Sequence, residues 1–297
     1  MKAKVVIPEK GLIRDLPRED YDKLQRVNWS RLKILGRSAA HFRHNMLTPS
    51  EDTDPRRLGR ATHLAALEPE KFASTCVVWK GGARRGKEWA DFLDEHDGLE
   101  VLTEGQHQRC MDIQRAVHGS SMAKRYLGGG SSEVTAIWTH KVEAIAGLPG
   151  FTIPCKARLD FEAREARALV DLKTTRDASP DAFGKQCATL QYYVQAAWYR
   201  DGYEAATGEM WPYVLIAVES EPPHVVQVYT VNEQILELGR DIYRGLLERL
   251  HQCRSTSKWV GYADEPLELT LPRWMAPKEE EGLDGLGLVT NQQSEDA

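Results

Sequence analysis

The side chains best suited to chemistry lie in residues 155–176, which read CKARLDFEAREARALVDLKTTR. Two strand-like stretches, 156–161 and 168–174, flank a polar link, and this pattern predicts a β-hairpin. Side chains alternate across a strand, so Asp171 and Lys173 share one face of the second stretch. The predicted hairpin therefore presents a carboxylate and an ammonium group on one surface.

Asp160, on the first stretch, comes close to the same surface if the hairpin pairs in register. Two carboxylates beside Lys173 would form a site of hard oxygen ligands with a cation next to it, which suits Mg²⁺ and an anionic phosphate. Spacing alone does not establish such a site, because alternating charged and apolar residues also occur as solvated ion pairs on half-exposed strands.

The order of these residues resembles the core of the PD-(D/E)XK nuclease superfamily, in which an aspartate on one strand is followed by Asp/Glu-x-Lys on the next. Asp160, Asp171 and Lys173 occupy those positions, and the string VDLKTTRDAS looks most like the RecE (exodeoxyribonuclease VIII) family. The resemblance implies that both aspartates hold Mg²⁺, or Mn²⁺ in its place, with the Leu172 carbonyl as a further ligand. Lys173 would orient a water molecule or stabilise charge on the phosphate, and both roles stay open.

A second window, LGRATHLAALEPEKF, resembles the RecE-type pattern in which glycine and histidine precede an apolar turn and Glu-Pro. A lone helical histidine is usually structural. The resemblance, however, assigns His63 to the metal site, with Gly59 allowing close backbone approach. Glu133, which opens a predicted strand at 133–139, matches an acidic residue that lies at the edge of the metal site in many relatives.

A third window, LQYYVQAAWYRDGY, resembles the Q-x-x-x-Y element of RecB- and RecE-type nucleases. Gln195 and Tyr199 are four residues apart and so share one face of a helix predicted at 181–205. By themselves they could form an ordinary polar patch, but in that family the pair supports the site and contacts DNA. Gln191 would lie one turn earlier on the same face.

The glycine-rich string KGGARRGKEW follows a strand-like stretch at 75–79. It is either a solvated loop or a contact to DNA phosphates through Arg84 and Arg85, with neighbouring tryptophans as stacking surfaces. Thr174, directly after Lys173, is a further predicted DNA contact.

Length and composition predict one main domain, because 297 residues with 41% hydrophobic content can bury one sizeable core. The resemblance implies an α/β fold with a restriction-endonuclease-like core, in which helices flank a central mixed β-sheet. The expected nuclease domain spans 1–275, with an N-terminal helical elaboration at 1–130 and a catalytic core at 131–275. A disordered, acidic tail is expected at 276–297.

Periodicity and capping residues place the other elements. A capping box at Thr103 and Gln106 opens one helix. Further helices are expected at 28–45, 54–69 and 232–253, and strands at 212–218 and 225–231.

Charge and cysteine usage narrow the class of protein. The net charge of −5 arises from residues 278–297, with one lysine and six acidic residues, so DNA attraction must come from local patches elsewhere. Five scattered cysteines without C-x-x-C spacing predict reduced thiols and no iron–sulfur cluster. Without an apolar run of about 18 residues or a secretory signal, we expect a cytoplasmic protein with no membrane segment.

The resemblance implies an exonuclease that degrades linear double-stranded DNA from its ends, 5′ to 3′, and generates single strands for phage or prophage recombination. Processive relatives close into rings, so a homo-oligomeric ring is expected, with a single-strand annealing protein as a further partner. Two alternatives remain: an endonuclease in repair or restriction, and a catalytically silent DNA-binding module.

Overall fold

The computed structural model describes residues 7–48, 53–144, 149–263 and 265–271. The chain divides into two compact units, residues 1–262 and 263–297. In the second unit, residues 265–271 are exposed and lack regular secondary structure. The acidic tail expected at 276–297 lies outside the described residues.

Six strands form the central sheet, in the order β1-β4-β5-β6-β7-β8. β6 and β7 pair in parallel, and the other neighbours pair antiparallel. This mixed sheet flanked by helices confirms the predicted fold class, and its strands at 213–219 and 226–230 confirm the two predicted there. The strands are Gly11–Ile13 (β1), Gly130–Val142 (β4), Phe151–Ala163 (β5), Ala168–Thr175 (β6), Tyr213–Glu219 (β7) and Val226–Thr230 (β8).

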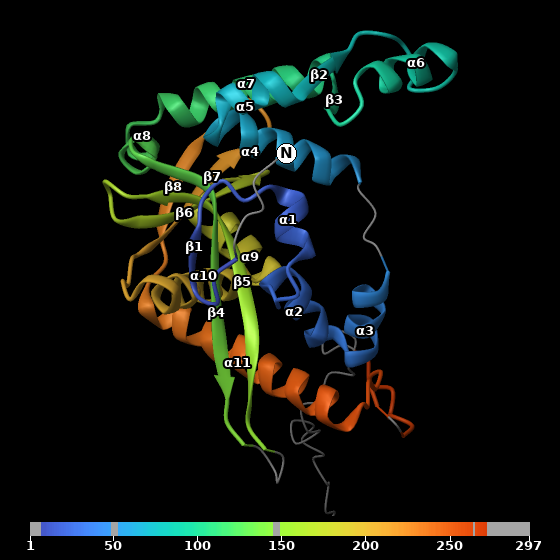
Figure 1. Cartoon of the computed structure of the whole chain (residues 1–297). Coiled ribbons are helices and arrows are strands. Elements are labelled where there is room, and N and C mark those ends of the chain that lie inside the picture. Colours follow the sequence, from blue (N-terminus) through green and yellow to red (C-terminus); the bar gives the residue numbers. More distant parts are fainter. Residues whose placement is uncertain (1–6, 49–52, 145–148, 264, 272–297) are drawn as a thin grey trace, which may run out of the picture. The chain divides into compact units, whose positions relative to one another are not determined.

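Helices cover both faces of the sheet, and one short strand pair stands apart from it (Figure 1). β2 (Cys76–Trp79) and β3 (Glu100–Thr103) pair in parallel as a separate two-stranded sheet. The N-terminal part is therefore not wholly helical. The helices are α1 (Arg18–Lys23), α2 (Trp29–Arg37), α3 (Ala39–Leu47), α4 (Asp54–Leu67), α5 (Pro69–Thr75), α6 (Lys87–Glu95), α7 (Glu104–Gly119), α8 (Ser121–Leu127), α9 (Pro180–Leu190), α10 (Tyr192–Thr207) and α11 (Glu233–Thr256).

Two hydrophobic cores fix the sheet between these helices. The larger core joins β4, β5 and β7 to α2, α10 and α11 through residues such as Trp138, Trp198 and Leu247. The second core joins β6 and β7 to α7 and α8, with Val170 and Ile216 at its centre. β6 contributes apolar side chains to both cores. Its polar residues therefore need hydrogen-bond or ion-pair partners within or beside these cores.

Two predicted helices are interrupted, which corrects the boundaries expected from periodicity. The helix expected at 28–45 breaks at Ser38, whose backbone is extended and whose hydroxyl accepts a hydrogen bond from the His41 amide at the start of α3. Serine can cap a new helix in this way because its side chain competes with the backbone for hydrogen bonds.

The helix expected at 181–205 breaks at Gln191. This residue has φ 59°, and its amide bonds back to Ala188, which ends α9 before α10 begins at Tyr192. Hydrophobic spacing continues on both sides of the break, so the pattern alone gives no sign of it. Gln191 still precedes Gln195 by one turn, since its carbonyl accepts a hydrogen bond from the Gln195 amide at 3.2 Å, but its backbone is left-handed and caps α10.

The predicted hairpin is confirmed, but its strands separate where the charged residues lie. β5 and β6 pair at three positions, from Phe161–Val170 to Ala163–Ala168. Beyond that point β6 is paired to β7 on its other side, and a gap opens between β5 and β6. On the opposite side of β5, Glu133 has φ 53° and falls between the register pairs of β4 with β5.

Candidate active site

Asp160 fills the gap between β5 and β6. Its Oδ2 atom accepts a hydrogen bond from the Leu172 amide at 3.0 Å and lies 3.3 Å from Nδ1 of His63. The sheet gap is therefore closed by a carboxylate from β5, which bonds to one peptide unit of β6, and by an imidazole from α4 beside that carboxylate.

Asp171 lies beside this unit and is almost completely buried. Its Oδ1 atom accepts a hydrogen bond from Nε2 of Gln195 on α10 at 3.1 Å, and its Oδ2 atom is 2.5 Å from Nζ of Lys173. Oδ2 nevertheless has no hydrogen bond of normal geometry. Tyr199 lies one turn further along α10. The structure thus brings the three predicted motif windows together at one place.

Burial and the charges of neighbouring side chains set the protonation states of Asp160, Lys173 and His63. Burial raises the pKa of Asp160, and the charge of Asp171 raises it further. Burial alone would lower the pKa of Lys173, but the charges of Asp171 and Asp160 outweigh it, so the pKa is raised. Burial, followed by the charge of Lys173, lowers the pKa of His63. At neutral pH the site therefore combines a charged lysine with a neutral imidazole, which is the form that can bind a metal.

The chemistry of these donors fits a divalent ion. Carboxylates of Asp160 and Asp171, the imidazole of His63 and the backbone carbonyl of Leu172 are ligand types that Mg²⁺ and Mn²⁺ accept. The buried Oδ2 atom of Asp171 is an acceptor that a cation would satisfy. Within the described residues, no three His, Cys, Asp or Glu side chains already converge on one point. Binding of an ion would draw these donors together.

Glu133 lines the same cleft as Asp160 and forms an ion pair with Arg158. Arg158 also donates a hydrogen bond to the Leu16 carbonyl at 3.1 Å. The carboxylate of Glu133 is therefore tied to the N-terminal segment as well as to the site.

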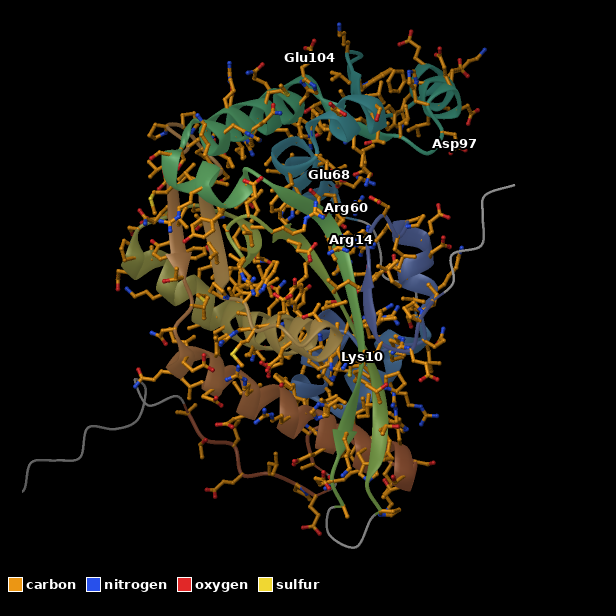
Figure 2. The ribbon with its side chains drawn as sticks, turned by 60° about the vertical axis from the view of Figure 1, so that its left-hand side comes forward. Lys10, Arg14, Arg60, Glu68, Asp97 and Glu104 are labelled. Carbon is orange, nitrogen blue, oxygen red and sulfur yellow. The ribbon has the colours of Figure 1, made fainter. Side chains whose placement is uncertain are left out.

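A cleft of about 920 Å³ runs past Asp160 and His63. Gly59 lies on its wall, and a Cβ atom at this position would meet nothing within 4 Å, so the backbone of α4 is accessible to a ligand there. Two of its lining residues, Arg60 and Glu68, lie near one another in Figure 2, whereas Asp97 of the α6 region lies apart. The cleft is lined by Asp15, Leu16, Pro17, Arg18, Arg56, Gly59, Arg60, His63, Leu64, Leu67, Glu68, Lys71, Ser132, Glu133, Arg158 and Asp160.

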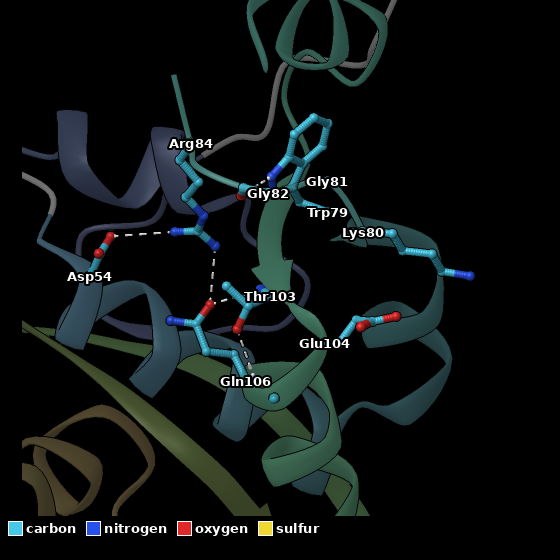
Figure 3. A pocket seen from close by; sticks show the side chains of 10 residues that line it. Asp54, Trp79, Lys80, Gly81, Gly82, Arg84, Thr103, Glu104 and Gln106 are labelled. Atoms are coloured by element: carbon cyan, nitrogen blue, oxygen red, sulfur yellow. Dashed lines mark hydrogen bonds and ion pairs between the residues drawn. The ribbon is translucent and has the colours of Figure 1, made fainter. Parts of the chain in front are cut away.

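The predicted DNA contacts of the glycine-rich loop lie outside this cleft. Arg84 donates hydrogen bonds to the Val101 carbonyl and to Oε1 of Gln106, and lies 3.9 Å from Asp54 (Figure 3). Its guanidinium group also lies over the ring of Trp89. Arg84 therefore holds its own loop together, while Arg85 is exposed beside it.

Two more predicted DNA contacts, Thr174 and Gln191, also lie away from the cleft. Thr174 lines a different cavity of about 590 Å³ with residues of α9. Gln191 occupies the break between α9 and α10.

One residue missed in the sequence contacts the site directly. The ring of Tyr192, the first residue of α10, lies 4.8 Å from Nζ of Lys173, a distance typical of a cation–π contact. Its hydroxyl accepts a hydrogen bond from Gln186 at 3.4 Å. Tyr192 stands within the window LQYYVQ, but the break at Gln191 that brings its ring to Lys173 has no signature in the sequence.

Residues 28–266 match the family model described as a PDDEXK-like domain of unknown function (DUF3799). The chain belongs to this PDDEXK-like family. Membership confirms the PD-(D/E)XK resemblance and, with it, the nuclease-like fold.

Comparison with solved structures finds one that shares the fold of this DUF3799 protein. A candidate exonuclease from Eubacterium rectale is 13% identical, with 89% of this chain and 99% of that chain covered, and a TM-score of 0.58. A phage-related exonuclease from Haemophilus somnus 129PT is 9% identical over 80% of this chain and 100% of that chain, but its TM-score of 0.33 is too low to compare folds. None of the curated proteins matches the chain in sequence.

Two further observations bear on the class of this PDDEXK-like protein. Every helix within the described ranges is too short or too polar to cross a membrane. Its five cysteines are free thiols, three of them buried.

Proposed function

We propose that this chain is a Mg²⁺-dependent DNA exonuclease that hydrolyses linear double-stranded DNA, 5′ to 3′, and supplies single strands for recombination. The observation that carries the proposal is the meeting of Asp160, Asp171, His63 and Lys173 at the β5–β6 gap, beside an open cleft. Buried carboxylates in a cleft, next to other groups with shifted pKa values, are typical of catalytic centres.

Each side chain would have a distinct role. Asp160, Asp171 and the Leu172 carbonyl would hold Mg²⁺, with His63 at a second ion position. When bound, such ions lower the pKa of a coordinated water and stabilise charge on the attacking and leaving oxygens. Lys173 stays charged through its aspartate neighbours, so it can orient the water or donate to a phosphate oxygen. Gln195 holds the carboxylate of Asp171 by a hydrogen bond, which keeps Asp171 aligned with Lys173.

The cleft supports a polyanionic substrate. Five of its lining residues are arginine or lysine, which can neutralise backbone phosphates: Arg18, Arg56, Arg60, Lys71 and Arg158. Four acidic residues share the cleft, so its positive electrostatic potential is moderate.

We propose that several copies close into a ring, which would retain the duplex between cuts and require a DNA end for loading. A single-strand annealing protein would take up the product strand.

Incubation with Mg²⁺ and matched linear and covalently closed circular duplexes tests the proposal. Linear DNA should be degraded while circles stay intact, and 5′-labelled ends should be released before 3′-labelled ends. Cutting of the circles would favour the endonuclease alternative. Binding without cleavage of either form would leave a silent DNA-binding module, and light scattering at a monomer mass would reject the ring.

A further inference from the structure

A small recess lies at the end of β5 that is remote from the β5–β6 gap. Its volume is about 90 Å³, room for roughly three water molecules. Three of its eight lining residues are arginines, and none is acidic. The lining residues are Gln25, Arg26, Val27, Arg31, Phe42, Met46, Pro154 and Arg254.

The three guanidinium groups come from separate parts of the chain. Arg26 is held by hydrogen bonds to the carbonyls of Trp138 at 3.1 Å and Glu9 at 3.2 Å. Arg31 belongs to α2 and Arg254 to the last turn of α11. Arginine does not lose its charge in proteins, so three of them around one recess repel each other until an anion or water compensates.

The helical segment beside the recess adds positive charge. Residues 25–48, which form α2, α3 and the preceding segment, contain five Lys or Arg and no Asp or Glu. By contrast, residues 80–104 contain four basic and seven acidic residues. Burial, followed by the charge of Arg31, lowers the pKa of Lys156 on β5 to about 8, and the charge of Asp22 offsets this in part.

The recess and the candidate active site lie on the same strand. Pro154 lines the recess, and Asp160 lies in the gap six residues further along β5. Six residues of β-strand span about 20 Å, which corresponds to about six base pairs of duplex DNA at 3.4 Å per step.

We infer that this recess binds a phosphate group of the DNA backbone, about six base pairs from the bond that is hydrolysed. The identity of the ligand follows from charge and size: a small anion fits among fixed guanidinium groups, whereas bases stay outside. The position relative to the cleaved bond rests on the proposed function. The contact would hold the duplex in register without reading its sequence.

The test compares Arg31→Gln/Arg254→Gln with Arg85→Gln/Lys87→Gln, which removes the same charge from the exposed loop before α6. Both pairs are made in an Asp171→Asn background, so that DNA is bound without being cut. Affinity is measured by fluorescence anisotropy on hairpins with stems of four or sixteen base pairs, between 50 and 200 mM salt. The recess variant should bind the long stem about 10-fold more weakly, with a salt slope lower by about 1 to 2.

The short stem should bind both variants alike, because it cannot span the distance to the recess. Unchanged affinity and salt slope in the recess variant would overturn the assignment, as would an equal loss in the loop variant. If the double variant melts early, Arg254→Gln alone provides the comparison, with a slope change of about 0.9.

Failure of the recess assignment can be distinguished from failure of the proposed nuclease function. Protein with an intact Asp171 that binds through the recess but cleaves no linear duplex would reject the nuclease and leave the recess assignment standing. Normal cleavage together with unchanged DNA binding in the recess variant would do the reverse.

Discussion

The β5–β6 gap and the arm at residues 80–104 both combine cations with carboxylates, yet they are built differently. In the gap, the Asp171 side chain is 1% exposed and takes its partners from β6 and α10. In the arm, no residue of α6 is buried, and Arg84 bonds to its own neighbourhood. A buried charged side chain with partners on separate elements therefore indicates a functional site better than a high local density of charged residues does.

Among substitutions in the two regions, the largest effect on cleavage is expected at Asp171. Asp171→Asn should lower the cleavage rate by about 10³-fold or more, as for other residues that act as a unit with their neighbours. Folding should be preserved because the amide fills the same volume. The rate on linear duplex and the melting temperature measure the two effects, and normal cleavage by this variant would remove Asp171 from the centre.

Lys173→Met separates metal binding from catalysis. Loss of the ammonium group should slow cleavage by about 10²- to 10³-fold, because a cation aimed at the reacting phosphate is lost. Binding of Mn²⁺, followed by electron paramagnetic resonance, should persist because the carboxylates remain. Loss of Mn²⁺ binding would show that Lys173 organises the metal site instead.

Gln195→Ala should have a smaller effect, through Asp171. Partners that orient a metal ligand typically contribute about 10- to 100-fold in metal affinity or activity. The Mg²⁺ concentration for half-maximal activity should therefore rise, while the affinity for DNA stays the same. A fall in DNA affinity with unchanged Mg²⁺ dependence would instead make Gln195 a substrate contact.

Arg84→Gln in the arm should have the smallest effect on cleavage. Its hydrogen bonds to Val101 and Gln106 stabilise the loop, so the variant should lose about 1 kcal/mol of unfolding free energy. The cleavage rate on linear duplex should stay within about twofold of the wild type, since Arg84 does not line the cleft beside Asp160. A rate loss without a change in melting would assign Arg84 to DNA binding after all.

The sequence was sufficient to predict the elements with strong local patterns. The alternation in ALVDLKTT set the strand and the shared face of Asp171 and Lys173, and the capping box at Thr103 and Gln106 is present at the start of α7. The three family motifs could be joined into one site because the resemblance supplied their mutual position. Local spacing could not have done so.

What the sequence could not give are features set by packing between distant elements. β5 and β6 stop pairing beyond Phe161–Val170, which leaves the Leu172 amide to the Asp160 side chain. The left-handed Gln191 interrupts an otherwise regular helical pattern and turns Tyr192 toward Lys173. The arginine recess collects residues from three parts of the chain that no periodicity relates.

The most direct test of the metal centre is diffraction from crystals soaked in Mn²⁺, with the ion located by its anomalous signal. We expect density at Asp160, Asp171 and the Leu172 carbonyl in the wild type, and its loss in Asp171→Asn. Bound Mn²⁺ at another place, or an ordered Asp160 and Asp171 without density at millimolar Mn²⁺, would contradict the assignment of the β5–β6 gap as a metal-dependent nuclease centre.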